Sequence, residues 1–195
     1  MILGITGPTG SGKTTLLQLI ADLGGTILDC DAIYHRLLAT DDGLLAAIAE
    51  RFPGTVTDHQ LDRKKLGAIV FADEQALLDL NTITHSAVKA QVLDLLTDTP
   101  SLAAIDAIGL FEGDLAQLCD VTVAVTAPES LRIQRLMARD GISQDYARSR
   151  IAAQHPENWY AQRCDYTLVN DSTQEVFTGK CLAFLTELGI MKEKM

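Results

Sequence analysis

Short apolar runs alternate along this chain with longer segments whose apolar residues recur at helical spacing. The runs predict five strands, over residues 2–6, 26–29, 101–106, 121–126 and 166–170. Between the first two, residues 13–23 form a helical pattern that ends at Gly24 and Gly25. This alternation is typical of a parallel sheet whose strands are joined by helices. We therefore expect an α/β fold, a three-layer α/β/α sandwich around a five-stranded parallel sheet.

The long stretch between the second and third predicted strands contains no convincing strand. Two helical patterns, over residues 61–71 and 74–96, dominate it. Because a connection of this length rarely lacks structure of its own, we expect a helical subdomain over about 41–99 within a single domain. The core would comprise residues 1–40, 100–130 and 164–195, and the tail after Gly189 would be a frayed helix end.

Composition narrows the classes of partner. The chain has 26 Asp and Glu against 16 Lys and Arg, a formal net charge of -10, which argues against nucleic acid as a partner because such binders need a basic surface. No apolar segment is long enough to span a membrane, and the start of the chain has no leader pattern. The four cysteines form no Cys-x-x-Cys pair. We expect a cytoplasmic protein with reduced thiols, a monomer or a weak homo-oligomer.

The sharpest motif is Gly7-Pro-Thr-Gly-Ser-Gly-Lys13-Thr14, which satisfies G-x-x-x-x-G-K-[ST]. It stands between a predicted strand and a predicted helix, the context that the motif requires. Glycines let the loop wrap a phosphate closely, so that backbone N–H groups and the helix N-terminus face the anion. Lys13 would then reach the β- and γ-phosphates of ATP, and the Thr14 hydroxyl would bind Mg²⁺.

Carboxylates follow two of the predicted strands. Asp29-Cys30-Asp31 ends the second strand, and Asp106 ends the third, six residues before Glu112. The carboxyl ends of the strands face the ligand crevice in an open α/β sheet. Asp31 could therefore accept the proton of an acceptor hydroxyl, or it could simply cap the next helix; the residues alone leave both interpretations open. Asp106 could contact Mg²⁺ through water and Glu112 a substrate, although a solvated turn would also explain both.

Positive charge is concentrated in residues 130–163, which carry a local charge of +3 and leave -13 on the rest of the chain. The arginines of this segment are Arg132, Arg135, Arg139, Arg148, Arg150 and Arg163. In a nucleotide kinase, a basic helix and loop at this point would form a lid, over about 131–163, that neutralises phosphates and excludes water. The alternative is a solvated face with ion pairs along the helix.

Taken in order, these motifs resemble the dephospho-CoA kinase family over almost the whole chain. Residues 6–15 resemble its phosphate loop, and Asp29-Cys30-Asp31 with Ile33 and His35 is similar to its D-A-D-x-I-A-[RH] element. In the helical stretch, the family's L-x-R element is matched by Leu61 and Arg63, its V-F element by Val70 and Phe71, and its I-x-H-P element by Ile83 and His85. Its D-x-P-L-L-F-E element is matched by Asp106 and by Leu110 to Glu112. Towards the end of the chain, its R-x-x-x-R-D element is matched by Arg135 and Arg139-Asp140, its R-I-x-x-Q element by Ile151 and Gln154, and its A-D-x-x-x-x-N element by Asp165 and Asn170.

The resemblance implies ATP-dependent, Mg²⁺-assisted phosphorylation of the ribose 3′-hydroxyl of dephospho-CoA, the last step of coenzyme A synthesis. It implies Asp31 as the base, Lys13 as a catalytic phosphate contact and Arg139 as a lid cation. The nucleotide side would comprise Gly10, Ser11, Gly12, Lys13, Thr14, Thr15, Arg135 and Asn170. The acceptor side, with the helical subdomain, would comprise Asp31, His35, Arg63, His85, Asp106 and Glu112.

Several positions depart from the family pattern. Ser86 follows His85 in place of proline, Ile108-Gly109 replaces Pro-Leu, and Tyr160 stands where the family usually has Lys or Arg. These departures fall in acceptor-side or lid elements, so they bear on the acceptor rather than on phosphoryl transfer. Two alternatives stay open: another P-loop kinase of a nucleoside monophosphate or small metabolite, and a non-catalytic ATP-binding regulator.

Overall fold

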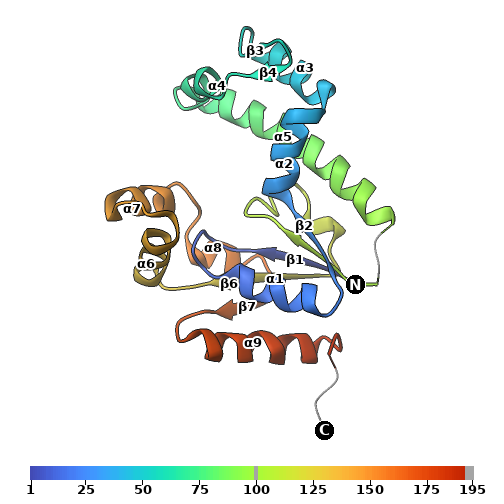
Figure 1. The fold of residues 1–195 in the computed structure, drawn as a ribbon, viewed down its shortest axis with the longest axis vertical. Helices are drawn as coiled ribbons and strands as arrows, with labels where there is room; N and C mark the ends of the chain where they lie inside the picture. The colour runs from blue at the N-terminus through green and yellow to red at the C-terminus, as the bar shows by residue number, and fades with distance from the viewer. Residues whose placement is uncertain (99–100, 192–195) are drawn as a thin grey trace.

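A five-stranded parallel sheet forms the centre of the molecule in the computed structural model, which describes residues 1–98 and 101–191. The strand order is β2-β5-β1-β6-β7 (Figure 1). The strands are β1 (Ile2–Thr6), β2 (Thr26–Asp29), β5 (Ala103–Asp106), β6 (Val121–Thr126) and β7 (Tyr166–Val169). The predicted parallel sheet is confirmed, with the third predicted strand starting two residues later and the fifth ending one residue earlier than expected.

Two helices cover one face of this sheet, α1 (Lys13–Asp22) and α9 (Gln174–Glu187). Their buried apolar residues form one core with alternate residues of the central strands, including Leu3, Ile5 and Val123. Side chains of neighbouring strand residues point to opposite faces, so Ile105 belongs to a second core on the other side. This arrangement is the expected three-layer α/β/α sandwich.

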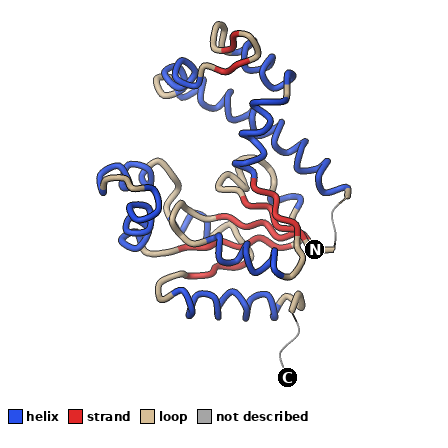
Figure 2. Tube along the Cα trace, viewed as in Figure 1, coloured by secondary structure: helices blue, strands red, loops and turns tan. Residues whose placement is uncertain are grey.

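The second core continues into a helical region that stands above one end of the sheet (Figures 1 and 2). Its helices are α2 (Cys30–Thr40), α3 (Asp42–Arg51), α4 (Arg63–Val70) and α5 (Glu74–Thr97). The two helices predicted from periodicity are confirmed. The first is shorter than expected, because the Asp62 side chain accepts a hydrogen bond from the Lys65 amide and so caps α4.

The expectation that this region lacks strands was wrong. A small antiparallel hairpin joins α3 to α4, formed by β3 (Val56–Thr57) and β4 (Gln60–Leu61). Its two turn residues, Asp58 and His59, have positive φ angles of 50° and 58°. Two-residue hairpin turns require such angles and usually take Asn-Gly or Asp-Gly. Asp-His is an unusual pair for this turn, so the sequence carries only a weak hairpin signal.

Three further helices follow β6 along the chain, α6 (Glu129–Asp140), α7 (Gln144–Ala152) and α8 (Glu157–Ala161). Helices α6 and α7 lie beside the sheet (Figure 1) and share a small apolar cluster of their own, formed by Ile133, Leu136, Ala147 and Ile151. Helix α8 packs on β6. A single turn of 3-10 helix, η1 (Ala116–Leu118), precedes β6.

Helix α9 ends at Glu187, and Ile190 and Met191 pack on the core beyond it. The tail after Gly189 was predicted to be a frayed helix end. Its last part, residues 192–195, lies outside the described residues. All four cysteines belong to the described part of the chain and are free. Within that part, every helix is too short or too polar to span a bilayer.

Candidate active site

The functional side chains meet where the parallel strands end. Asp29 at the end of β2 lies opposite Asp106 at the end of β5, and Asp106 pairs in register with Ile5 of β1. The loop of residues 7–12 follows β1 directly and leads into α1. The carboxyl ends of neighbouring parallel strands thus bring the glycine-rich loop and the two predicted acidic segments to one edge of the sheet.

The glycine-rich loop has the backbone that its sequence predicts. Gly7, Gly10 and Gly12 all have positive φ angles, of 133°, 78° and 99°. A Cβ atom at Gly7 would lie 2.0 Å from the Val125 carbonyl oxygen of β6. No side chain fits there, because a Cβ cannot approach a backbone oxygen so closely and because φ is positive.

Two side chains hold the loop from outside. Arg135 of α6 donates from Nη1 to the carbonyl oxygens of Gly10 and Ser11, both at 3.3 Å. Asn170, buried after β7, donates from Nδ2 to the Ser11 carbonyl oxygen at 2.8 Å and accepts from Arg135 Nη2 at 3.0 Å. Both residues were predicted on the nucleotide side. The structure places them against the loop backbone, where they fix its shape.

Lys13 is the first residue of α1, and its side chain reaches back to the start of the loop. Its Nζ atom donates to the Gly7 carbonyl oxygen at 2.9 Å. Burial lowers the pKa of the Lys13 ammonium, whereas the carboxylates of Asp106 and Asp31 favour its charged form and oppose that shift. Burial removes water from the ammonium, which makes its positive charge costly. A phosphate bound at the loop would stabilise that charge in place of water, so the position of Lys13 suits an anionic ligand.

A cleft of about 690 Å³ opens beside the loop. Six of the predicted site residues with charged or hydroxyl side chains line it: Lys13, Thr14, Asp31, Asp106, Arg135 and Arg139. Gly10 and Gly12 contribute backbone to the same walls. The structure therefore brings the predicted phosphate loop, the two crevice carboxylates and two arginines of α6 into one space.

Asp29 and Asp31 have different roles in the structure. The Asp29 carboxylate accepts a hydrogen bond from the Ala32 amide at 3.0 Å and is the N-cap of α2. Asp31 stands in the first turn of that helix and is exposed. The capping role that Asp31 could have had thus belongs to Asp29. The Asp31 carboxylate is left to face the cleft.

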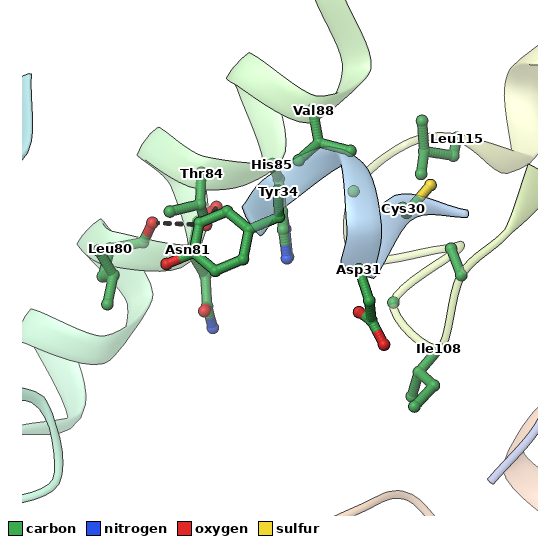
Figure 3. A pocket seen from close by; sticks show the side chains of 13 residues that line it. Cys30, Asp31, Tyr34, Leu80, Asn81, Thr84, His85, Val88, Ile108 and Leu115 are labelled. Atoms are coloured by element: carbon green, nitrogen blue, oxygen red, sulfur yellow. Dashed lines mark hydrogen bonds between the residues drawn. The ribbon is translucent and has the colours of Figure 1, made fainter. Parts of the chain in front are cut away.

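A second pocket, of about 250 Å³, adjoins the cleft. Helices α2 and α5 and the loop after β5 form its walls. Figure 3 shows Tyr34, Asn81 and Thr84 on one side of it, and Asp31 with Ile108 on the other. Asp31 and Ile108 line both this pocket and the phosphate-loop cleft. The two spaces therefore meet at the Asp31 carboxylate.

Asp106 differs from an ordinary surface carboxylate. Burial raises its pKa to about 6, and although the Lys13 ammonium counteracts this, the nearby carboxylates of Asp29 and Asp31 add to the rise. A bound cation would reverse the balance and favour the ionised form. The group is therefore poised to respond to positive charge in the cleft.

The donors present fit a magnesium ion carried by a nucleotide. Within the part of the chain that the structure describes, no group of three or more His, Cys, Asp or Glu side chains could hold a metal alone. Mg²⁺ bound with phosphates needs only one or two protein oxygens and keeps several waters. The Thr14 hydroxyl and the Asp106 carboxylate both line the cleft and could supply them.

Other predicted residues lie outside the phosphate-loop cleft. Ser11 is buried inside the loop, and the Thr15 hydroxyl accepts a hydrogen bond from Gln174 at 2.8 Å. His35 and Arg63 line a separate apolar groove of about 230 Å³ in the helical region. His85 lines the second pocket.

Glu112 was predicted to contact substrate. In the structure its carboxylate lies 3.0 Å from His155 Nε2, and its backbone oxygen lies 3.2 Å from His85 Nδ1. Glu112 thus links the segment before α8 to α5. This contact joins residues far apart in the sequence, and no local pattern could have revealed it.

Some lining residues were not assigned to the site from the sequence. Arg150 and Gln154 line the cleft, and Tyr34 and Asn81 line the second pocket. Arg150 is one of six arginines in its segment, and their spacing alone does not tell which of them face the cleft. Gln154 also accepts a hydrogen bond from the Thr9 amide through Oε1 at 2.8 Å, which brings the end of α7 to the loop.

A parallel sheet with this phosphate loop after its first strand defines the chain as a P-loop nucleotide-binding fold. The model of the dephospho-CoA kinase family matches residues 1–175. The chain belongs to this family of phosphotransferases.

One curated relative agrees with this assignment, and two solved structures have a similar fold. The dephospho-CoA kinase of Anaeromyxobacter dehalogenans is 36% identical over 193 residues, covering 96% of this chain and 92% of the relative. A solved structure from Thermus thermophilus is 32% identical, with a TM-score of 0.81 and coverage of 96% of this chain and 97% of the other. The solved dephospho-CoA kinase of Campylobacter jejuni is 24% identical, with a TM-score of 0.67 and coverage of 97% and 98%.

Proposed function

We propose that this chain transfers the γ-phosphoryl group of ATP to the ribose 3′-hydroxyl of dephospho-CoA, producing coenzyme A and ADP. The observation that carries the proposal is the position of Asp31. Its carboxylate lies where the phosphate-loop cleft meets the second pocket. A hydroxyl bound in the pocket would meet a phosphoryl group held in the cleft at this point.

The nucleotide would occupy the cleft, with its phosphates against the loop. Backbone N–H groups of the loop and the Lys13 ammonium would hold the β- and γ-phosphates. Mg²⁺, held by the Thr14 hydroxyl and through water by Asp106, would neutralise charge on the phosphates. Arg135 and Asn170 would keep the loop in the required shape through their bonds to its carbonyl oxygens.

Asp31 would orient the acceptor. Its carboxylate would accept the proton of the 3′-hydroxyl as that oxygen bonds to the γ-phosphorus and the bond to the ADP oxygen breaks. Arg139 would stabilise negative charge on the transferring group. Most of the catalysis would come from positioning and electrostatics rather than from covalent chemistry by the protein.

The two flanking regions would then have distinct tasks. Residues of about 41–99, together with α2, would receive the acceptor, and residues of about 131–163 would act as a lid over the phosphates. Tyr34, Asn81 and Thr84 give the second pocket hydroxyl and amide groups, which suit a polar ribose. His85 lines the same pocket, whereas Arg63 and His35 would contact more distant parts of the acceptor from the neighbouring groove.

An ADP-release assay tests this function. Purified protein would receive Mg·ATP with dephospho-CoA, a nucleoside monophosphate, or a small polyol, and Lys13→Ala would serve as the inactive control. We expect ADP release that depends on dephospho-CoA and falls by about 10² or more in the control. Turnover with another acceptor in place of dephospho-CoA would contradict the proposed substrate. ATP binding without turnover on any acceptor would contradict catalysis.

A further inference from the structure

One carboxylate in the arginine-rich segment binds two arginines. Asp140, the last residue of α6, accepts from Arg139 Nε through Oδ1 at 2.7 Å and from Arg139 Nη2 through Oδ2 at 3.0 Å. Its Oδ2 atom also accepts from Arg150 Nη1 of α7 at 2.6 Å. Asp140 thus ties the side chains of two neighbouring helices to one point.

Both of these arginines line the phosphate-loop cleft, whereas Asp140 is not among its lining residues. The contacts engage Nε and one terminal nitrogen of Arg139, and one terminal nitrogen of Arg150. Each guanidinium therefore keeps a terminal nitrogen that Asp140 does not touch. The two side chains remain 61% and 37% exposed, so ligands can reach them.

The arrangement has the geometry of a strong, oriented contact. Side-on pairing of a carboxylate with Nε and Nη2 of an arginine fixes the plane of the guanidinium. The hydrogen bond from Arg139, reinforced by the one from Arg150, lowers the pKa of Asp140 to about 2, so the carboxylate stays ionised in neutral solution. Long arginine side chains lose much rotamer freedom when they bind, and a contact that orders them beforehand reduces that loss.

We propose that Asp140 is a positioning residue for the nucleotide phosphates: it holds Arg139 and Arg150 together at the cleft, and Arg150 is a second phosphate-binding arginine beside Arg139. This inference rests on the proposed function only in placing the phosphates of ATP in this cleft. It adds a residue that acts through the arginines, and it selects Arg150 from the six arginines of the predicted lid segment.

Positioning and net charge predict opposite changes in ATP binding when Asp140 is removed. Asp140 is a negative charge beside a site for a polyanion, so its removal should strengthen ATP binding if only net charge matters. If Asp140 orders the two arginines, its removal should weaken ATP binding and slow turnover. A single substitution therefore separates the two effects.

Asp140→Asn is the test variant, and Asp145→Asn is the matched control. Asp145 is an exposed residue of α7 in the same segment and does not line the cleft, so the control removes the same charge. Binding of Mg·ATP is measured by calorimetry without acceptor, and kcat and KM for ATP are measured with dephospho-CoA. We expect Asp140→Asn to raise the Kd for Mg·ATP roughly three- to tenfold and to lower kcat, and Asp145→Asn to change either by less than about twofold.

A double-mutant cycle distinguishes positioning from a general structural role. The loss caused by Asp140→Asn should be smaller in an Arg139→Gln background and in an Arg150→Gln background, because one arm of the contact is already gone. An equal loss in all backgrounds, unchanged binding, or tighter binding in Asp140→Asn would overturn the proposal. If dephospho-CoA is not phosphorylated, the proposed function fails while the binding comparison still decides the role of Asp140. If the wild-type chain does not bind Mg·ATP, both fail.

Discussion

Asn170 and Gly12 fit together so closely that the loop admits no side chain at residue 12. A Cβ atom at Gly12 would lie 2.2 Å from Asn170 Nδ2, the atom that donates to the Ser11 carbonyl oxygen. Gly12 also has a φ of 99° and is the N-cap of α1. The start of the phosphate-loop helix is therefore shaped by a residue that follows the last strand of the sheet.

Gly12→Ala tests this fit. The new methyl group would displace Asn170 and strain the backbone, so we expect the affinity for ATP to fall at least about tenfold and stability to fall by about 1–3 kcal/mol. Gly179→Ala is the matched control, because Gly179 lies in α9 with open space around its Cβ position. That change should keep ATP binding and leave stability equal or higher. Calorimetry and urea unfolding measure both effects; normal ATP binding by Gly12→Ala would show that the contact does not shape the loop.

Asn170→Ala removes the amide that holds the Ser11 carbonyl oxygen and also takes a partner from Arg135. Because Asn170 is buried, the Ser11 carbonyl would lose the nearer of its two donors in a place that water reaches poorly, and would keep only the longer bond from Arg135. We expect a loss of stability of about 1–3 kcal/mol and a rise in the KM for ATP with little change in the KM for the acceptor. If only the KM for the acceptor rose, Asn170 would act on acceptor binding and not on the nucleotide loop.

The two aspartates before and within α2 should respond differently to the same change. Asn is as good an N-cap as Asp, so Asp29→Asn should keep the fold and most of the activity. Asp31→Asn removes the proposed base and should lower kcat by about 10² or more without unfolding the protein. Steady-state kinetics with both variants make the comparison. Near-normal turnover by Asp31→Asn would exclude Asp31 as the base.

Asp106 should make stability depend on pH in the metal-free protein. Burial raises its folded-state pKa to about 6, so the unfolded chain loses this proton at a lower pH than the folded chain. Between pH about 4 and 6 the unfolded state then binds fewer protons, and the contribution of Asp106 to stability decreases as pH rises, by up to about 3 kcal/mol.

Urea unfolding in chelator isolates this effect. The free energy of unfolding of the wild-type protein minus that of Asp106→Asn should decrease from pH about 4 to 6 and stay constant above pH about 7. The substituted protein cannot titrate at this position, and both proteins share every other ionisable group. A difference that increases over the same interval would mean that the carboxylate is stabilised in its charged form.

The strands and the phosphate loop could be predicted because their signals are local. An apolar run such as residues 121–126 needs only its own residues to be recognised, and the motif from Gly7 to Thr14 carries its function within eight residues. The turn at Asp58 and His59 was missed because both residues adopt positive φ without the usual glycine. A sequence signal for a turn is weak where its residues differ from those that usually form it.

The assignments at the site depended more on hydrogen bonds and ion pairs that the residue types alone do not specify. The sequence could not tell which aspartate caps α2, since Asp29 and Asp31 are both suitable; the bond from the Ala32 amide to Asp29 decides it. The pairing of Glu112 with His155 brings together separate parts of the chain. This second contact follows from the way the chain packs around the sheet, which periodicity does not encode.

The position of the new phosphate on the product tests the central claim most directly. Purified protein would be incubated with Mg·ATP and dephospho-CoA, and the product examined by phosphorus and proton NMR, with a 3′-deoxy analogue of dephospho-CoA in a parallel reaction. We predict one new phosphate on the ribose 3′-oxygen, equimolar ADP, and no product from the analogue. Phosphate at another position, or phosphorylation of the analogue at the same rate, would contradict the account.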